Sequence, residues 1–166
     1  MNIFLMETLA AWVPTTPEME VKVLFGRHLW LVAQQADKLG RRARELRAPL
    51  NFARPPAEGF GKALAALAAL QPTGGRLEGL YECALPSLAR AYNDYLAQTE
   101  PLIDEPTVLM LEDAARDIDR MRRESAALLD AFPAVRAGAT EAAAGVRRAF
   151  SEAGGAVQIA AQAQPA

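Results

Sequence analysis

The sequence predicts an all-α fold, an antiparallel four-helix bundle with short accessory helices. Apolar residues recur every three or four positions over long stretches, and prolines and glycines separate these stretches from one another. No period of twenty to fifty residues repeats, so a helical solenoid is not expected. At 166 residues the chain fits one domain with one core. We expect a single helical domain over residues 1–153 and a disordered, Ala/Gln-rich tail over residues 154–166.

Composition places the chain among globular proteins. Hydrophobic residues make up 51% and charged residues 23%, and the mean hydropathy is near zero. A net charge of −2 gives no field that would draw the molecule to nucleic acid or to an anionic membrane. The apolar first residues lack a basic region and are interrupted by Glu7, which argues against a signal peptide or a membrane span. Because Cys83 is alone in the sequence, we expect a reducing compartment, the cytoplasm.

The first two predicted helices occupy residues 2–13 and roughly 17–47. The first is expected to end at Pro14, and the second to begin after a threonine cap with Pro17 in its first turn and to close at Pro49. Four arginines, at positions 41, 42, 44 and 47, suit the negative end of the second helix. The inward face of the first helix is predicted to be Ile3, Met6, Leu9, Ala10 and Val13. That of the second is Val21, Leu24 or Phe25, His28, Val32, Gln35, Leu39, Ala43 and Leu46.

The middle of the chain contains one long helix and one short one. Residues 51–56 read as a loop and residues 60–70 as a short Ala/Leu-rich helix, followed by a turn over residues 71–75. A third main helix spans residues 77–96, and Pro86 within it predicts a kink rather than a break. Its expected inward face is Leu77, Leu80, Tyr81, Ala84, Leu85, Leu88, Tyr92, Tyr95 and Leu96.

The last main helix begins at an acidic segment, Asp104–Thr107, after a break at Pro101. It runs to about residue 129, and a short Ala-rich helix follows from Pro133 to about Ala153. The inward face of the main helix is predicted to be Val108, Leu111, Ala114 or Ala115, Ile118, Met121, Ser125 and Leu128.

Helical bundles of this size often hold two metal ions between carboxylates and a pair of histidines, each three residues after a glutamate. This chain has one histidine, His28, and no glutamate three residues before it. Halfway along the second and fourth main helices, the residues are Val32 and Gln35, then Ile118 and Met121. Because two hydrocarbon side chains, an amide and a thioether are poor ligands for a hard cation, we expect no metal, no cofactor and no catalytic residue.

Two runs carry a family resemblance. They are GRHLWLVAQQAD over residues 26–37 and DEPTVLMLED over residues 104–113. Both are similar to a bacterial branch of the ferritin-like superfamily of di-metal carboxylate bundles, whose members have a Trp followed by His-Ala-Asp, and later a Glu-x-x-His. The resemblance spans residues 7–129. It implies a ferritin-like bundle fold and, for the superfamily, oxidation or iron handling at a dinuclear centre.

Against that pattern, Trp30, Ala36 and Asp37 match, whereas Gln35 stands where the histidine is expected. Ile118 and Met121 occupy the two ligand positions of the later helix. The chain is therefore identified as a degenerate member of the superfamily.

The individual polar residues have structural and functional interpretations. His28 is interpreted as a hydrogen-bonded core histidine rather than a ligand or an acid–base group, with Glu20 as the partner that the inward face suggests. Gln35 is interpreted as a core amide bonded to a tyrosine or to backbone, rather than a group that orients a bound molecule. The three tyrosines and Cys83 are interpreted as packing residues, rather than as a pocket lining, radical sites or a nucleophile.

The leading hypothesis is a metal-free, non-catalytic protein that acts through its surfaces as an accessory, assembly or interaction subunit, with a protein partner or as a homo-oligomer. One alternative is a helical bundle that binds a small apolar molecule. Another is an oxidoreductase whose metal is mononuclear at His28 or completed across an interface. The residues proposed to line a pocket are His28, Val32, Gln35, Tyr81, Ile118 and Met121.

Overall fold

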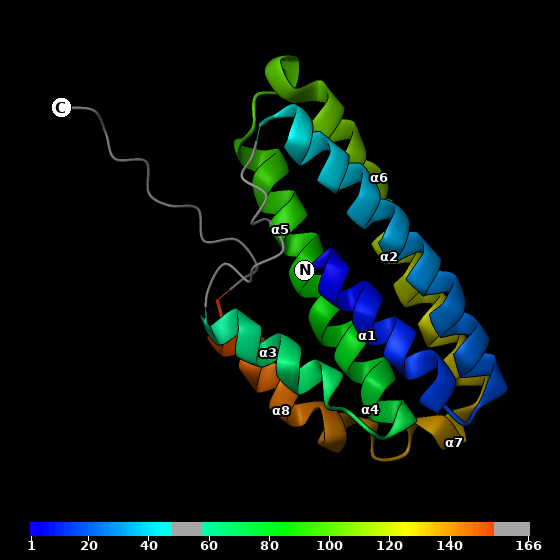
Figure 1. The fold of residues 1–166 in the computed structure, drawn as a ribbon. Helices are drawn as coiled ribbons and strands as arrows, with labels where there is room; N and C mark the ends of the chain where they lie inside the picture. The colour runs from blue at the N-terminus through cyan, green and yellow to red at the C-terminus, as the bar shows by residue number, and fades with distance from the viewer. Residues whose placement is uncertain (48–57, 155–166) are drawn as a thin grey trace.

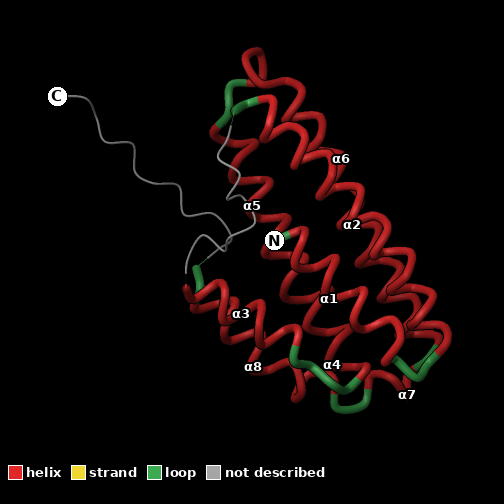
Figure 2. Tube along the Cα trace, viewed as in Figure 1, coloured by secondary structure: helices red, strands yellow, loops and turns green. Residues whose placement is uncertain are grey.

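The computed structural model describes residues 1–47 and 58–154 (Figure 1). These residues form helices and connecting loops without a strand, which confirms the all-α prediction (Figure 2). The expected loop over residues 51–56, the helix end at Pro49 and residues 155–166 of the expected tail lie outside the described residues. The elements are α1 (Asn2–Thr15), α2 (Met19–Glu45), α3 (Glu58–Ala68), α4 (Thr73–Glu78), the π-helical η1 (Gly79–Ala84), α5 (Leu85–Gln98), α6 (Pro101–Ala131), α7 (Pro133–Arg136) and α8 (Ala139–Glu152).

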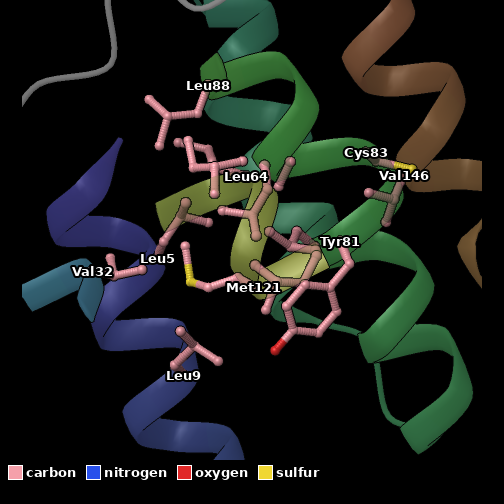
Figure 3. Packing of buried hydrophobic residues seen from close by; sticks show 14 of the residues in the cluster. Leu5, Leu9, Val32, Leu64, Tyr81, Cys83, Leu88, Met121 and Val146 are labelled. Atoms are coloured by element: carbon pink, nitrogen blue, oxygen red, sulfur yellow. The ribbon is translucent and has the colours of Figure 1, made fainter. Parts of the chain in front are cut away.

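The helices pack in two groups that share the segment from α4 to α5. In the first group, α1 lies against α2, α2 against α6, and α6 against α5. In the second group, α3 and α8 lie side by side and cover α4 and η1 (Figure 1). One core of buried apolar side chains runs through both groups, and Figure 3 shows part of it.

The inward face predicted for α2 is largely confirmed. Val21, Leu24, Phe25, His28, Val32 and Gln35 are all buried. Towards the end of the helix the pattern fades, because Leu39 and Ala43 are half-buried and Leu46 is exposed. The same comparison holds for α6, where Leu111, Ala114, Ile118, Met121 and Ser125 are buried.

The inward face predicted for the first helix is confirmed at Leu9 and wrong at the other four positions. The apolar residues that α1 buries are Leu5, Leu9 and Trp12, whereas Ile3, Met6 and Val13 are half-buried and Ala10 is exposed. The physical reason is that α1 is apolar on nearly all sides, so its periodicity does not define one face. Pro14 does not end the helix either, because α1 continues through it to Thr15.

A buried arginine holds the corner where α1 ends. Arg76 of α4 donates from Nε to the carbonyl of Leu70 at 2.9 Å and from a terminal nitrogen to the hydroxyls of Thr15 and Thr16. Both threonines in turn donate to the carbonyl of Trp12, at 3.2 and 2.8 Å. Thus the expected threonine cap of the second helix is wrong: these hydroxyls satisfy the last carbonyls of α1 instead, and the cation sits at its negative end.

The turn predicted over residues 71–75 is shorter than expected, because α4 already begins at Thr73. Gly74 and Gly75 are helical residues, and their lack of a side chain permits the close approach of the C-terminal segment. A Cβ on Gly75 would lie 2.8 Å from the Cβ of Ala142, and one on Gly74 would clash with the carbonyl of Val135. These glycines therefore serve helix packing rather than a turn.

The backbone remains helical through Pro86, as predicted for one helix without a break. The turn that precedes Pro86 is π-helical rather than α-helical. At the end of η1, the amide of Leu85 donates to the carbonyl of Leu80, five residues earlier. The next carbonyl, that of Tyr81, would need the amide of Pro86 in this register, and proline has none. The guanidinium of Arg122 on α6 donates to it instead, at 3.0 Å.

Two further helix boundaries differ from the predictions. α6 begins at Pro101, but Asp104 has non-helical dihedral angles and its carboxylate accepts from the Thr107 hydroxyl at 2.6 Å, so a second helix start lies where the sequence indicates one. The single C-terminal helix is divided into α7 and α8 by Gly138, whose φ of +72° is a left-handed conformation that favours glycine.

Candidate functional site

Three polar side chains of α2, seven residues apart, bond to side chains of α6. His28, Gln35 and Arg42 on α2 bond to Glu124, Asp117 and Asp104 on α6, respectively. Since positions rise along α2 as they fall along α6, the two helices are antiparallel. A seven-residue spacing keeps these side chains on the seam between the helices. The His28–Glu124 and Gln35–Asp117 pairs, seven residues apart on both helices, therefore mark one register of α2 against α6, whereas Arg42 reaches Asp104 at the kink near the start of α6.

Both ring nitrogens of His28, on this seam, form hydrogen bonds. Its side chain is fully buried. Nε2 lies 2.9 Å from Oε2 of Glu124, and Nδ1 lies 2.6 Å from the Tyr81 hydroxyl. Because an ionised carboxylate only accepts, we assign the hydrogen to Nε2, which leaves Nδ1 to accept from Tyr81. The neutral imidazole thus satisfies all three groups.

Burial dominates the electrostatics of the triad formed by Tyr81, His28 and Glu124. Loss of solvent lowers the pKa of His28 below its ordinary value of 6.5, and the hydrogen bond to Glu124 opposes this only in part. Burial raises the pKa of Tyr81 well above 10. The hydrogen bond from His28 lowers the pKa of Glu124. At neutral pH the triad therefore holds a neutral phenol, a neutral imidazole and a carboxylate.

Glu124 connects the buried histidine to the surface. Its second oxygen, Oε1, lies 3.1 Å from Nε of Arg120 and 3.3 Å from a terminal nitrogen of Arg27. Both arginines are exposed, so these pairs are screened by solvent and are worth little individually. Both oxygens of the Glu124 carboxylate therefore contact protein side chains. Glu20, the partner suggested by the sequence, does not bond to His28, so that prediction is wrong, whereas the interpretation of His28 as a hydrogen-bonded core residue is confirmed.

Between the His28–Glu124 pair and the Gln35–Asp117 pair, the side chains on the seam are two hydrocarbons and a thioether. Val32, Ile118 and Met121 are buried within the apolar core. Figure 3 shows Met121 in the cluster that also contains Val32 and Leu5. No carboxylate stands at these positions to balance the charge of a metal ion.

The donor set of the structure does not fit the dinuclear centre that the superfamily implies. The two carboxylates that face α2 along this part of the seam are Asp117 and Glu124. Glu124 is bonded to His28 and two arginines, and Asp117 lies 3.5 Å from the amide nitrogen of Gln35. Within residues 1–47 and 58–154, no group of three or more His, Cys, Asp or Glu side chains is placed to hold a metal ion.

Gln35 is the least well satisfied polar residue of the seam. Among residues 1–47 and 58–154, its amide nitrogen makes only the long contact with Asp117, and its buried oxygen Oε1 has no hydrogen-bond partner. The predicted partner, a tyrosine or a backbone group, is therefore wrong. A buried acceptor without a partner costs free energy, so this layer contributes less to stability than the His28 layer.

Arg42 and its partners lie at the other end of the seam. Arg42 donates to Asp104 at 2.7 Å and to the Thr107 hydroxyl at 2.9 Å. The Tyr95 hydroxyl donates to the other oxygen of Asp104 at 2.6 Å. The hydrogen bonds that Asp104 accepts from Thr107, Tyr95 and Arg42 lower its pKa to about 2. Tyr95 was expected to face inward, but its ring is partly exposed because the hydroxyl reaches this surface carboxylate.

The six residues proposed to line a pocket are all buried. Tyr81 alone among them lines the cavity of about 350 Å³ between η1, α6 and α8. The other lining residues are Leu77, Glu78, Glu82, Ser125, Ala126, Leu129, Arg136 and Thr140. A surface hollow on α8 involves none of the six.

Sequence reasoning missed Glu124, which completes the triad. It lies three residues after Met121 on the same side of α6, and the seven-residue spacing from Asp117 to Glu124 repeats that from His28 to Gln35. Matching these spacings would have paired the two helices. Arg122 was also missed, and no local pattern signals it, because its role depends on the π-helical register of another helix.

Cys83 is buried next to Arg147, and burial raises the pKa of its thiol, in agreement with the packing role expected. None of the helices in the described part of the chain combines the length and apolar character needed to cross a bilayer. Comparisons with protein-family models, with curated proteins and with solved structures find no match to this chain.

Proposed function

We propose that this protein is a metal-free, ferritin-like four-helix bundle that performs no catalysis and acts through its surfaces as an accessory or interaction subunit. In this proposal α1, α2, the segment from α4 to α5, and α6 are the four bundle helices. The observation that carries it is the apolar packing of Val32, Ile118 and Met121 where the superfamily has metal ligands.

The use of the remaining polar groups supports the same conclusion. His28 has no free nitrogen, because Tyr81 and Glu124 occupy both. A general base must reach the proton of a bound substrate, and the fully buried imidazole offers no such access. Its satisfied hydrogen bonds instead join α2, η1 and α6. The interior is thus built for stability and register.

Elemental analysis of the full-length protein tests the proposal. The protein is purified from medium supplemented with iron and manganese, and the metal content per chain is measured before and after treatment with a chelator. We expect substoichiometric metal and an unchanged thermal midpoint after chelation. Two bound ions per chain, or a chelator-induced fall in the midpoint, would overturn the proposal.

His28→Gln is the matched variant for a mononuclear site. Glutamine retains hydrogen-bonding capacity but is a much weaker metal ligand than imidazole. If the wild type bound one ion and this variant none, the protein would contain a metal site at His28, and the metal-free proposal would fail. Equal and substoichiometric metal in both proteins is the expected result.

A further inference from the structure

The cavity of about 350 Å³ between η1, α6 and α8 is lined by groups of both charges and by hydrocarbon side chains. Glu78 and Glu82 contribute carboxylates from α4 and η1, and Arg136 contributes a guanidinium from α7. Leu77 and Leu129 belong to its apolar lining. Because small-molecule sites in proteins have volumes of about 300–1,000 Å³, this cavity suits a ligand at the small end of that range.

Ser125 of α6 supplies a polar group that no part of the described chain satisfies. The residue is only 2% exposed and lines the cavity, and its hydroxyl forms no hydrogen bond within residues 1–47 and 58–154. Among the buried and half-buried residues of that range, Oε1 of Gln35 is the one unpartnered polar side-chain atom that is shut off from solvent. The Ser125 hydroxyl therefore reaches the cavity. Since buried polar groups are nearly always hydrogen-bonded, this hydroxyl indicates a polar ligand there.

Across the cavity, α6 runs antiparallel to α4 and η1, and this sets the order of the polar groups. Arg122 of α6 bonds to Glu82 at 2.8 Å, whereas α7, which follows the end of α6, packs against α4. One turn further along each helix, Ser125 of α6 therefore lies opposite Glu78 of α4. Arg136 of α7 lies beyond both, at the other end of the cavity. The cavity thus has an acidic end and a basic end.

The acidic end keeps hydrogen-bond acceptors free. Glu78 pairs with Arg147 through Oε1, and Glu82 pairs through Oε2 with an arginine of α6. Within residues 1–47 and 58–154, the second oxygen of each carboxylate accepts no hydrogen bond. These two oxygens and the hydroxyl of Ser125 offer three acceptors, which match the three N–H groups of an ammonium.

The basic end combines Arg136 with the start of α8. Arg136 lies 3.6 Å from Asp130, which is longer than a hydrogen bond, and both side chains are exposed. Thr140 also lines the cavity and lies in the first turn of α8, where the N-cap residue, Gly138, has no side chain to cap the helix. The amides of a first turn lack acceptors within the helix and form its positive end. This end therefore suits a carboxylate.

We infer that this cavity binds a dipeptide with free termini and apolar side chains. The ammonium donates to Glu78, Glu82 and Ser125. The carboxylate accepts from Arg136 and from the start of α8. Along the cavity, α6 contributes residues from Ser125 to Leu129, a rise of about 6 Å. Two extended residues span about 7 Å, whereas the two charges of a single α-amino acid lie too close together to reach both ends.

Leucyl-leucine is the probe, and two blocked forms test the two ends of the cavity. Isothermal titration calorimetry on the full-length protein should give a dissociation constant of about 10 µM–1 mM for leucyl-leucine, as expected for a ligand of this size. N-acetyl-leucyl-leucine lacks the ammonium, and leucyl-leucinamide lacks the carboxylate. Each should bind at least about tenfold more weakly, because one charged end of the cavity then loses its partner.

Two variants locate the binding site. Ser125→Ala should raise the dissociation constant for leucyl-leucine at least about threefold, because one hydrogen bond to the peptide is lost. The thermal midpoint should not fall, since the hydroxyl has no partner within the described chain to lose. Arg136→Gln should raise the dissociation constant for leucyl-leucine about tenfold. It should leave the weaker binding of leucyl-leucinamide unchanged, because that peptide has no carboxylate for the arginine to bind.

Arg123→Gln is the matched control, because Arg123 is an exposed arginine of α6 that does not line the cavity. It should bind leucyl-leucine as the wild type does. If Ser125→Ala fails to fold, Arg136→Gln still decides, since Arg136 is exposed. The absence of saturable binding at up to about 10 mM peptide overturns the inference. A blocked dipeptide that binds as tightly as the free one, or an unchanged affinity in either variant, overturns it as well. Metal content is measured separately, so each of these failures leaves the metal-free proposal standing.

Discussion

Replacing Tyr81 by phenylalanine removes one hydroxyl from the buried triad. The ring remains, but Nδ1 of His28 loses the donor that lies 2.6 Å away. Because His28 is fully buried, water does not replace that donor without a rearrangement. An unpaired buried acceptor costs about 1–3 kcal/mol, so we expect Tyr81→Phe to lower the free energy of unfolding by that amount.

A double-mutant cycle with His28→Leu separates this hydrogen bond from packing effects. When both partners become apolar, no buried polar atom is left unpaired between them, so the double variant should lose less stability than the sum of the single variants. We expect a coupling energy of about 1–2 kcal/mol between the two sites.

Urea unfolding at pH 7.5, followed by circular dichroism, measures each free energy of unfolding. Nitrogen-15 NMR of the imidazole adds an independent readout, because His28 is the one histidine in the sequence. The wild type should show a neutral ring protonated at Nε2. Additive single-variant effects, or a loss below about 0.5 kcal/mol in Tyr81→Phe, would show that the triad does not contribute as argued.

Three further predictions concern pH, packing and the π-helical segment. Burial lowers the pKa of His28 below 6.5 in the folded state, so the unfolded chain takes up a proton first as the pH falls. The free energy of unfolding should therefore decrease as the pH drops below 6.5 and level off below the folded-state pKa. His28→Gln should abolish this part of the pH dependence in urea titrations. Gly74→Ala should lower the thermal midpoint by overpacking worth about 1–3 kcal/mol, because its Cβ would clash with the backbone carbonyl oxygen of Val135; an unchanged midpoint would contradict this. Arg122→Met should lower the free energy of unfolding in urea by about 1–2 kcal/mol, since the Tyr81 carbonyl loses its donor. Pro86→Ala restores an amide that can donate to this carbonyl, so Arg122→Met should cost less in a Pro86→Ala background. An equal cost in both backgrounds would contradict the explanation.

The sequence predicted the interior of α2 and α6 well, because both helices have a polar face that defines the apolar one. The positions of His28, Val32, Ile118 and Met121 followed from spacing alone. The same reasoning failed for most of α1, where a nearly continuous apolar sequence fits several orientations. Met6 and Leu9 were both placed on the inward face, but only Leu9 is buried. Local propensity also misplaced Gly74, whose helical position is required by a neighbouring segment.

Amino-acid pattern by itself determined the all-helical class, the main helices and the apolar character of Val32, Ile118 and Met121 between α2 and α6, since these depend on periodicity and on side-chain chemistry at known spacings. Tertiary structure decided which polar groups meet. Tyr81, His28 and Glu124 come from three helices, and their bonds depend on the register of one helix against another and on the π-helical segment before Pro86. A hydrogen bond requires a partner within about 3 Å, and for residues more than fifty positions apart only the folded packing fixes such a distance.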